Sequence, residues 1–180
     1  MNIRFCGFGG QGILVAGRIM GMAAAGAGRN ALQNQAYGSA SRGGTCYSDV
    51  TISDSEIYEL EPHEFDVLVA LSQQACDKFL PMLKKDGLLI TDKDLVRLKP
   101  ELVEDYVHHS LSATDTAHHE FGRDILANII IIGLLNNLAG LLDDGIIEDA
   151  ITTVVPEGTE EINIMAYRLG KELAEKLDKV

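Results

Sequence analysis

The sequence predicts an α/β protein, a three-layer α/β/α sandwich with a helical C-terminal third. Two observations carry this prediction: short apolar strand patterns alternate with helical patterns as far as residue 112, and only helical patterns follow from Asp115. The chain has 180 residues, of which 46% are hydrophobic, enough to bury one sizeable core. We therefore expect a single domain over residues 1–180.

The predicted strands are short segments in which polar and apolar residues alternate, or apolar runs bounded by turn residues. They cover residues 2–8, 31–35, 46–53, 66–72, 88–92 and 106–112. The stretch EIYEL at 56–60 is expected to continue the third strand past a turn at Asp54 and Ser55. The run DVLVALS at 66–72 is apolar almost throughout, which is typical of a central strand covered on both faces.

Helices are predicted at residues 11–28, 74–87, 115–122, 125–141, 145–154 and 159–178. Gly17 and Gly21 give the first of them a small-residue face, which is expected to lie close to the sheet. The segment 125–142 is long and apolar but interrupted by asparagines, so we expect a buried core helix and not a membrane span. The last helix has one apolar stripe, for which packing on the sheet is favoured over self-association.

Charge is distributed unevenly along the chain. The net charge is -12, which argues against nucleic acid as a partner because phosphate binding needs Lys and Arg. The first 48 residues nevertheless contain four arginines and no acidic residue, so they carry +4 while the remainder carries -16. This segment is either an anion-binding face or a region of tight small-residue packing that excludes carboxylates.

Three cysteines, Cys6, Cys46 and Cys76, lie far apart in the sequence with no C-x-x-C spacing. They form neither a disulfide framework nor an iron–sulfur or zinc ligand set. We expect buried, reduced thiols in a cytoplasmic protein without a signal peptide.

The stretch FCGFGGQGIL at 5–14 is the first candidate binding motif, because Gly7, Gly9 and Gly12 fit the pattern G-x-G-x-x-G. Backbone N–H groups at such a turn, together with the following helix, suit phosphate or carboxylate oxygens. A dinucleotide site also needs an acidic residue about 20 positions later, at the end of the second strand. That place holds the amides of residues 33–35, so an oxidoreductase using NAD or a flavin remains only the alternative interpretation.

The stretch SRGGT at 41–45 is the second candidate. Arg42 offers a planar set of donors, and Gly43 and Gly44 allow a tight backbone concavity, so the loop suits a phosphate or carboxylate. The alternative is an exposed turn with a solvated arginine. Adjacent His118 and His119 would point about 100° apart on a helix, so no metal site is expected there, and we find no catalytic residue.

Several stretches together resemble one known family. GFGGQGI followed by an Ala-rich helix, then YGSASRGG and DVTISDSEI, is similar to the gamma subunit of the 2-oxoacid:ferredoxin oxidoreductases. The same domain occurs fused within single-chain pyruvate:ferredoxin oxidoreductase. The resemblance continues through FDVLVAL, LLITD and LANIIIIGLL to INIMAYRLG, and so covers nearly the whole chain.

This resemblance implies a Rossmann-like subunit of a complex that converts a 2-oxoacid to acyl-coenzyme A, CO2 and reduced ferredoxin. Thiamine diphosphate would lie between the alpha and beta subunits, and iron–sulfur clusters on beta or delta subunits, so this chain would bind neither. A short chain of this kind looks most like the 2-oxoglutarate branch, with pyruvate and branched-chain oxoacids left open. The isolated chain could form a homodimer.

The implied partners are the alpha, beta and delta subunits, with ferredoxin reached through the complex, and neither nucleic acid nor a membrane. Eight residues are the candidate contacts to coenzyme A or to a partner subunit. They are Gly9, Gly10, Gln11, Gly12, Tyr37, Arg42, Gly43 and Gly44.

Overall fold

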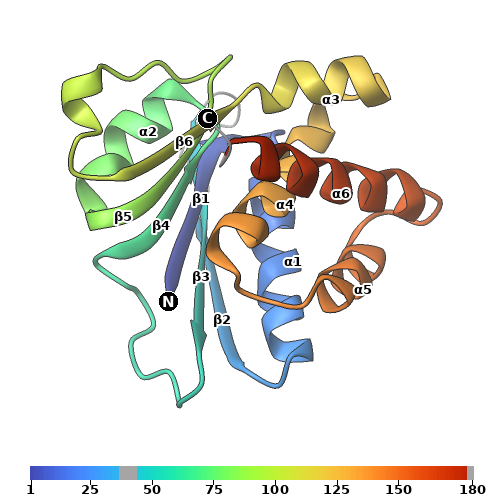
Figure 1. Ribbon diagram of the computed structural model, residues 1–180. Coiled ribbons are helices and arrows are strands. Elements are labelled where there is room, and N and C mark those ends of the chain that lie inside the picture. Colours follow the sequence, from blue (N-terminus) through green and yellow to red (C-terminus); the bar gives the residue numbers. More distant parts are fainter. Residues whose placement is uncertain (37–43, 178–180) are drawn as a thin grey trace.

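The computed structural model describes residues 1–36 and 44–177 and places six strands in one mixed sheet (Figure 1). The strands are β1 (Asn2–Phe8), β2 (Asn30–Ala36), β3 (Thr45–Ser53), β4 (Phe65–Ala70), β5 (Leu83–Asp92) and β6 (Val107–Leu111). The helices are α1 (Ile13–Gly26), α2 (Gln73–Phe79), α3 (Ala113–Phe121), α4 (Ala127–Ala139), α5 (Asp144–Val154) and α6 (Glu160–Leu177). Short 3₁₀ turns cover Leu80–Met82, Pro100–Leu102 and Asp124–Leu126.

The order of the strands in the sheet is β2-β3-β1-β4-β5-β6. β1 pairs in parallel with β4, β4 with β5, and β5 with β6, whereas β3 pairs antiparallel with both of its neighbours, β1 and β2. β3 is thus the one described strand that runs against the others. The carboxyl ends of β1, β4, β5 and β6 therefore meet at one edge of the sheet.

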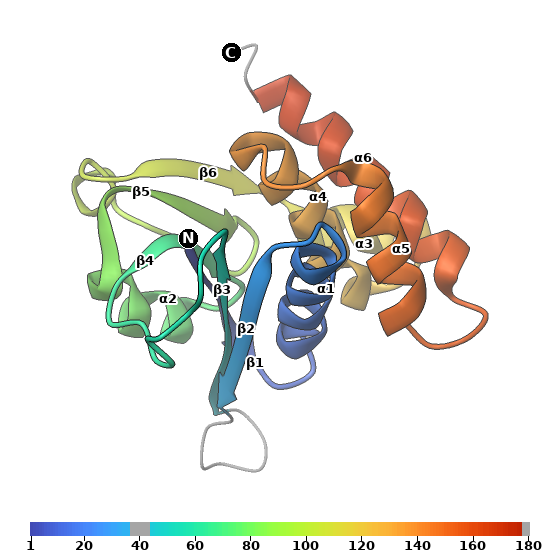
Figure 2. The same ribbon diagram turned by 90° about the horizontal axis from the view of Figure 1, so that it is seen from below.

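Helices cover the two faces of the sheet unequally. α1, α4, α5 and α6 lie on one side and α2 lies on the other (Figures 1 and 2). The larger buried apolar cluster fills the space under α1, α4, α5 and α6, and a smaller one lies between the sheet and α2. The predicted three-layer α/β/α architecture is confirmed.

Two predicted elements are wrong. The helix predicted over 74–87 ends at Phe79, because Pro81 lacks an amide N–H and opens a 3₁₀ turn, after which Leu83 pairs with Phe65 in the sheet. The stretch at 56–60 is not a strand and pairs with no described strand. The other predicted strands and helices are present, with ends displaced by a few residues.

The three cysteines are free and buried, as the sequence predicts. Burial raises the pKa of the Cys76 thiol to about 12, so this group is protonated and unreactive at neutral pH. Among residues 1–36 and 44–177, no helix has the length and apolar character needed to cross a membrane.

Two glycines allow α4 and α6 to cross at very short range. A methyl group on Gly133 would overlap the Tyr167 carbonyl oxygen, and one on Gly170 would overlap the Ile130 carbonyl oxygen. The last helix therefore packs on α4 through backbone contact. The self-association considered for its apolar stripe is not needed to bury it, because residues of that stripe pack against the main core.

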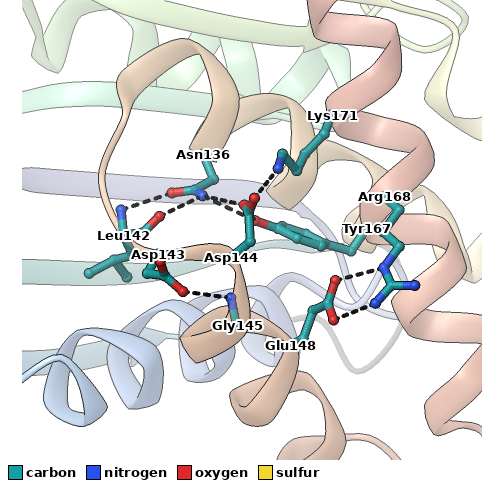
Figure 3. A network of polar contacts seen from close by, with 9 residues as sticks. All are labelled: Asn136, Leu142, Asp143, Asp144, Gly145, Glu148, Tyr167, Arg168 and Lys171. Atoms are coloured by element: carbon teal, nitrogen blue, oxygen red, sulfur yellow. Dashed lines mark hydrogen bonds and ion pairs between the residues drawn. The ribbon is translucent and has the colours of Figure 1, made fainter.

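A polar network joins the start of α5 to α4 and α6 (Figure 3). The buried Tyr167 hydroxyl donates to Asp144 at 2.7 Å and accepts from the Asn136 side chain at 3.0 Å. Lys171 forms an ion pair with the other Asp144 oxygen, and Arg168 makes two hydrogen bonds of 2.7 Å to Glu148. One carboxylate at the start of α5 is thus shared by donors from both neighbouring helices.

The Asp144→Asn variant is expected to lose about 1 kcal/mol of stability at neutral pH, discounted for the partial exposure of this side chain. Hydrogen bonding by Lys171 holds the pKa of Asp144 below its ordinary value, so its stabilisation is present above that ordinary value. It is lost as the pH falls through the lowered value, and the deficit of the variant should therefore shrink in acid. Thermal midpoints of wild type and variant at about pH 7 and about pH 3 test whether the deficit shrinks in acid. The exposed Asp149→Asn is the matched control.

Candidate functional site

The site lies where the connections of two adjacent parallel strands diverge. The chain leaves β1 for α1 on one face of the sheet, and leaves β4 for α2 on the other face (Figures 1 and 2). In open α/β sheets such a divergence opens a crevice outside the carboxyl ends of the strands. The glycine turn at 9–12 and the turn at Leu71 and Ser72 form its two walls.

Gln11 joins these two walls. Its side-chain oxygen accepts a hydrogen bond of 2.6 Å from the Phe8 N–H, and its side-chain nitrogen donates at 2.7 Å to the Leu71 carbonyl oxygen. Gly7 makes room for this arrangement, because a methyl group there would overlap the Gln11 oxygen. The first glycine of the motif therefore accommodates a side chain of the protein itself.

Gly12 has a similar packing role. It begins α1 in the left-handed conformation, with φ of 71°, and a methyl group on it would overlap the Asn128 side chain from α4. Asn128 donates a hydrogen bond of 3.1 Å to the Gly12 carbonyl oxygen. By contrast, a methyl group on Gly9 or Gly10 would meet no heavy atom within 4 Å, so these two glycines present open backbone.

Two adjoining cavities, of about 270 Å³ and 420 Å³, lie along the crevice and share Gln11, Leu71 and Leu95 in their walls. The smaller continues over Thr114 and Ile125, and the larger lies beside α2. Asp92, at the end of β5, supports the far wall by accepting 2.9 Å and 2.6 Å hydrogen bonds from the amide and hydroxyl of Thr114. Burial raises the pKa of Asp92, and the hydrogen bonds from Thr114 oppose this rise.

The described walls of these cavities carry no basic side chain. The ionisable groups among the described lining residues are Asp124 in the smaller cavity and Asp77 in the larger. Two of the arginines from the first 48 residues are already paired, Arg4 with Asp49 in the core and Arg29 with Asp54 at the surface. The positive charge of that segment is therefore not concentrated at the described part of the glycine turn.

The structure brings together five of the eight candidate residues. Gly9, Gly10, Gln11 and Gly12 form the turn after β1. Gly44 lies at the same edge, because Phe8 pairs with Thr45 and the next residues outward on the two strands are Gly9 and Gly44. Tyr37, Arg42 and Gly43 lie outside the described residues.

Sequence reasoning missed the residues that complete the crevice. Leu71 lies near the end of the strand predicted over 66–72, and the rule that carboxyl ends of parallel strands share an edge could have placed it here. Asn128 is an amide within the apolar run LANIIII, and a polar side chain in a buried helix needs a specific partner. No signal in the sequence indicated Leu95 or Thr114, which reach the crevice through the loop and helix that follow β5 and β6.

The strand order argues against a dinucleotide site. The acidic residue that binds a ribose normally stands at the end of the strand adjacent to β1. Here β3 separates β2 from β1, so the end of β2 lies two strand spacings, about 9–10 Å, from the glycine turn. The side chain of Gln33 is also engaged, donating at 2.8 Å to Ser48.

Within the described part of the chain, no group of three or more His, Cys, Asp or Glu side chains is arranged to hold a metal ion. The two adjacent histidines bind separate carboxylates: His118 lies 2.8 Å from Asp124, and His119 lies 3.3 Å from Asp115. This divergence agrees with their expected angular separation on α3.

The Gln11→Met variant is expected to cost about 2 kcal/mol of unfolding free energy, because it removes two hydrogen bonds at nearly constant side-chain length. The Phe8 amide and Leu71 carbonyl would lose their shared partner, and the two walls of the crevice would separate. Urea unfolding measures the loss. The exposed Gln35→Met is the control and should change stability by less than about 0.5 kcal/mol; equal stability of the two variants would contradict the bridging role.

Comparison with known proteins agrees with this architecture. The family model for pyruvate ferredoxin/flavodoxin oxidoreductase matches residues 2–173. The chain is 41% identical over 177 residues to the 2-oxoglutarate synthase subunit KorC of Methanocaldococcus jannaschii, covering 98% of this chain and 95% of that protein. It is likewise 41% identical over 179 residues to KorC of Methanothermobacter thermautotrophicus, covering 96% and 94%.

A solved structure is similar to the same extent. The gamma subunit of a keto/oxoacid ferredoxin oxidoreductase from Geobacter sulfurreducens superposes with a TM-score of 0.85 at 40% identity, covering 97% of this chain and 98% of that one. The match extends over both the strands that form the crevice and the C-terminal helices. The resemblance inferred from the glycine motifs is confirmed, and this chain belongs to the pyruvate ferredoxin/flavodoxin oxidoreductase family.

Proposed function

We propose that this chain is the gamma-type subunit of a 2-oxoglutarate:ferredoxin oxidoreductase, a complex that forms succinyl-coenzyme A, CO2 and reduced ferredoxin. The observation that carries the proposal is the 41% identity to 2-oxoglutarate synthase subunits over nearly the full length of both chains. Pyruvate and branched-chain oxoacids are the competing substrates. The substrate is chosen by the alpha and beta subunits, with which this chain assembles together with a delta subunit.

Within the complex this chain is a structural subunit that also contacts coenzyme A, and the redox centres are held by its partner subunits. Thiamine diphosphate and iron–sulfur clusters are held by other subunits, through which ferredoxin is reached. In support, the three cysteines are buried, and the described residues offer no metal-binding group. Free thiols also fit a reducing compartment, and we place the complex in the cytoplasm.

The crevice at Gly9–Gly12 is the contact of this chain with coenzyme A. Its described walls combine apolar side chains with Gln11 and Thr114 and carry acids in place of bases. Such walls suit the neutral arm of coenzyme A, which bears amides and a thiol, better than its phosphates. We therefore assign the phosphates to other groups, with Tyr37, Arg42, Gly43 and Gly44 as the candidates within this chain.

Purification of the tagged chain from its native cells tests the proposal. We expect co-elution with thiamine- and cluster-bearing chains, and reduction of viologen with 2-oxoglutarate and coenzyme A. Turnover should be at least about tenfold slower with pyruvate or 3-methyl-2-oxobutanoate, the size of a 1.4 kcal/mol preference. The isolated chain should show no turnover and no NADH binding; viologen reduction by the chain alone would refute the proposed role.

A further inference from the structure

Residues 54–64 have the sequence pattern of a strand but no strand partner. The stretch EIYEL places Ile57, Tyr58 and Leu60 among glutamates, and isoleucine and tyrosine are enriched in strands. In the structure it is extended loop, and among the described residues no backbone–backbone hydrogen bond involves any residue from 54 to 64. Side chains bind the carbonyls of Leu60 and Glu64 and the amide of Ser55, whereas the backbone N–H and C=O groups of residues 56–59 are open to a further chain.

This loop and the edge strand β2 enclose a groove of about 350 Å³, here called the β2 groove. It lies on the face of the sheet opposite α1, because Gln33 of β2 points toward α1 and the neighbouring Leu32 points away. The groove is lined by Asn30, Ala31, Leu32, Glu56, Ile57, Tyr58 and Leu60. On this face of the sheet α2 packs on β1, β4 and β3, and it lies away from β2 (Figure 2).

Apolar side chains are unusually exposed along this groove. Tyr58 is 85% exposed and Leu60 63%, the two highest values among the large hydrophobic residues that the structure describes. Exposed aromatic and aliphatic side chains beside an unpaired strand edge are typical of protein-binding surfaces. The Asn34 side chain donates to the Leu60 carbonyl, which anchors the loop beside β2.

Charge indicates which kind of polypeptide fits. Residues 54–64 contain five acidic side chains and no Lys or Arg. Asp54 is paired with Arg29, and Glu56 accepts a hydrogen bond of 2.6 Å from the Tyr58 hydroxyl. Glu56, Glu59 and Glu61 are exposed and form no ion pair with a described residue, so their charge favours a basic partner. A second copy of this chain would bring the same acidic loop into a symmetric interface, where like charges repel.

We propose that the β2 groove binds an extended, lysine- or arginine-rich segment of a partner polypeptide, which pairs with the backbone of residues 56–60. An aliphatic side chain of that segment would pack between Tyr58 and Leu32, and its basic residues would face the three glutamates. The segment would be recognised as an added strand through its backbone, and the glutamates would select for its basic side chains. The inference rests on the proposed function only in taking the partner to be another subunit of the complex.

Hydrogen–deuterium exchange of the complex and of the isolated chain tests the site directly. Pairing predicts that amides of residues 56–60 exchange at least about tenfold more slowly in the complex. Unchanged exchange there in a complex that still turns over 2-oxoglutarate would overturn the proposed surface and leave the proposed function intact. The same protection in a homodimer of the isolated chain, detected by light scattering, would also overturn it.

Charge reversal gives a matched test. The variant E56K/E59K/E61K is expected to weaken assembly at least about tenfold, the loss expected when rim charges oppose a basic segment. The control E157K/E172K/E175K changes the net charge equally at exposed positions near and on α6 and should assemble normally. Equal assembly of both variants would overturn the proposal, and circular dichroism confirms that both are folded.

A labelled peptide of alternating Lys and Val provides a measurement that does not depend on the complex. Wild type and control should bind it, and the loop variant should bind at least about tenfold more weakly. Equal binding by all three proteins would overturn the proposal. If the peptide binds as expected but the chain joins no oxidoreductase subunits, the proposed function is refuted, whereas the β2 groove is still a binding site for a basic, extended segment.

Discussion

The Gly170→Ala variant is expected to lower the free energy of unfolding by about 3 kcal/mol, the upper part of the range for an inserted methyl group in a packed core. The added carbon would lie 2.8 Å from the Ile130 carbonyl carbon and overlap its oxygen, both of which are backbone atoms of α4. Backbone cannot rotate away as a side chain can, so α6 must shift. Urea unfolding followed by circular dichroism measures the loss.

Gly21→Ala in α1 is the matched control, because it makes the same change in the middle of another helix. A methyl group there would meet only Val50 of β3, at 4.0 Å, an ordinary contact. Alanine is a better helix former than glycine by about 1 kcal/mol, so this variant should be as stable as wild type or more stable. Similar losses in both variants would show that the short α4–α6 contact is not what glycine serves at position 170.

The Arg4→Leu variant is expected to lose about 3–5 kcal/mol, since it leaves a buried carboxylate without its partner. Arg4 makes two hydrogen bonds of 2.7 Å to Asp49, and both residues are about 5% exposed. Its guanidinium also lies over the rings of Tyr47 and Phe65, at 4.1 Å and 4.2 Å from their centres. The substitution removes the ion pair and this stacking together.

The pH dependence of that variant identifies the cause of the loss. Burial raises the pKa of Asp49, and hydrogen bonds from Arg4 oppose the rise, so removing Arg4 should raise the pKa further. A raised carboxyl pKa means that the folded state holds more protons than the unfolded state, and stability then falls as pH rises through the window above about 3.9. The deficit should therefore be smaller at about pH 4.5 than at about pH 7.5.

The double variant R4L/D49L completes the experiment. Replacing both members of a buried ion pair with apolar residues often restores stability. The double variant should therefore regain most of the stability that Arg4→Leu loses, and the pH dependence of that loss should disappear. A double variant as unstable as Arg4→Leu would instead assign the loss to the stacking on Tyr47 and Phe65. Chemical denaturation at the two pH values separates these outcomes.

Local sequence patterns were reliable wherever the period of apolar residues was long or bounded by clear turn residues. The helix at 144–154 and the strand at 2–8 were predicted nearly to the residue, because each pattern has one interpretation. The pattern at 56–60 was misleading, since strand-forming residues show that a segment can pair and say nothing of whether a neighbouring strand is present. Pro81 was the available signal that the second helix stops early.

The candidate site was predicted in part. The two glycine-rich stretches were predicted to contact coenzyme A or a partner subunit together, and the pairing of Phe8 with Thr45 places Gly44 beside Gly9 at one edge of the sheet. The positive charge of the first 48 residues was a misleading signal, because a count of arginines cannot show that Arg4 points into the core toward Asp49. That pairing joins residues 45 positions apart and depends on the register of β1 and β3.

The sequence by itself determined the α/β class, the family and the glycine turn, because each depends on local periodicity or on the spacing of neighbouring residues. Only the tertiary structure decided the use of that turn: β3 separates β2 from it, Gln11 ties it to Leu71, and Asn128 fills the space at Gly12. These contacts join elements up to 116 residues apart. Their geometry follows from strand order and helix packing, which no short stretch of sequence encodes.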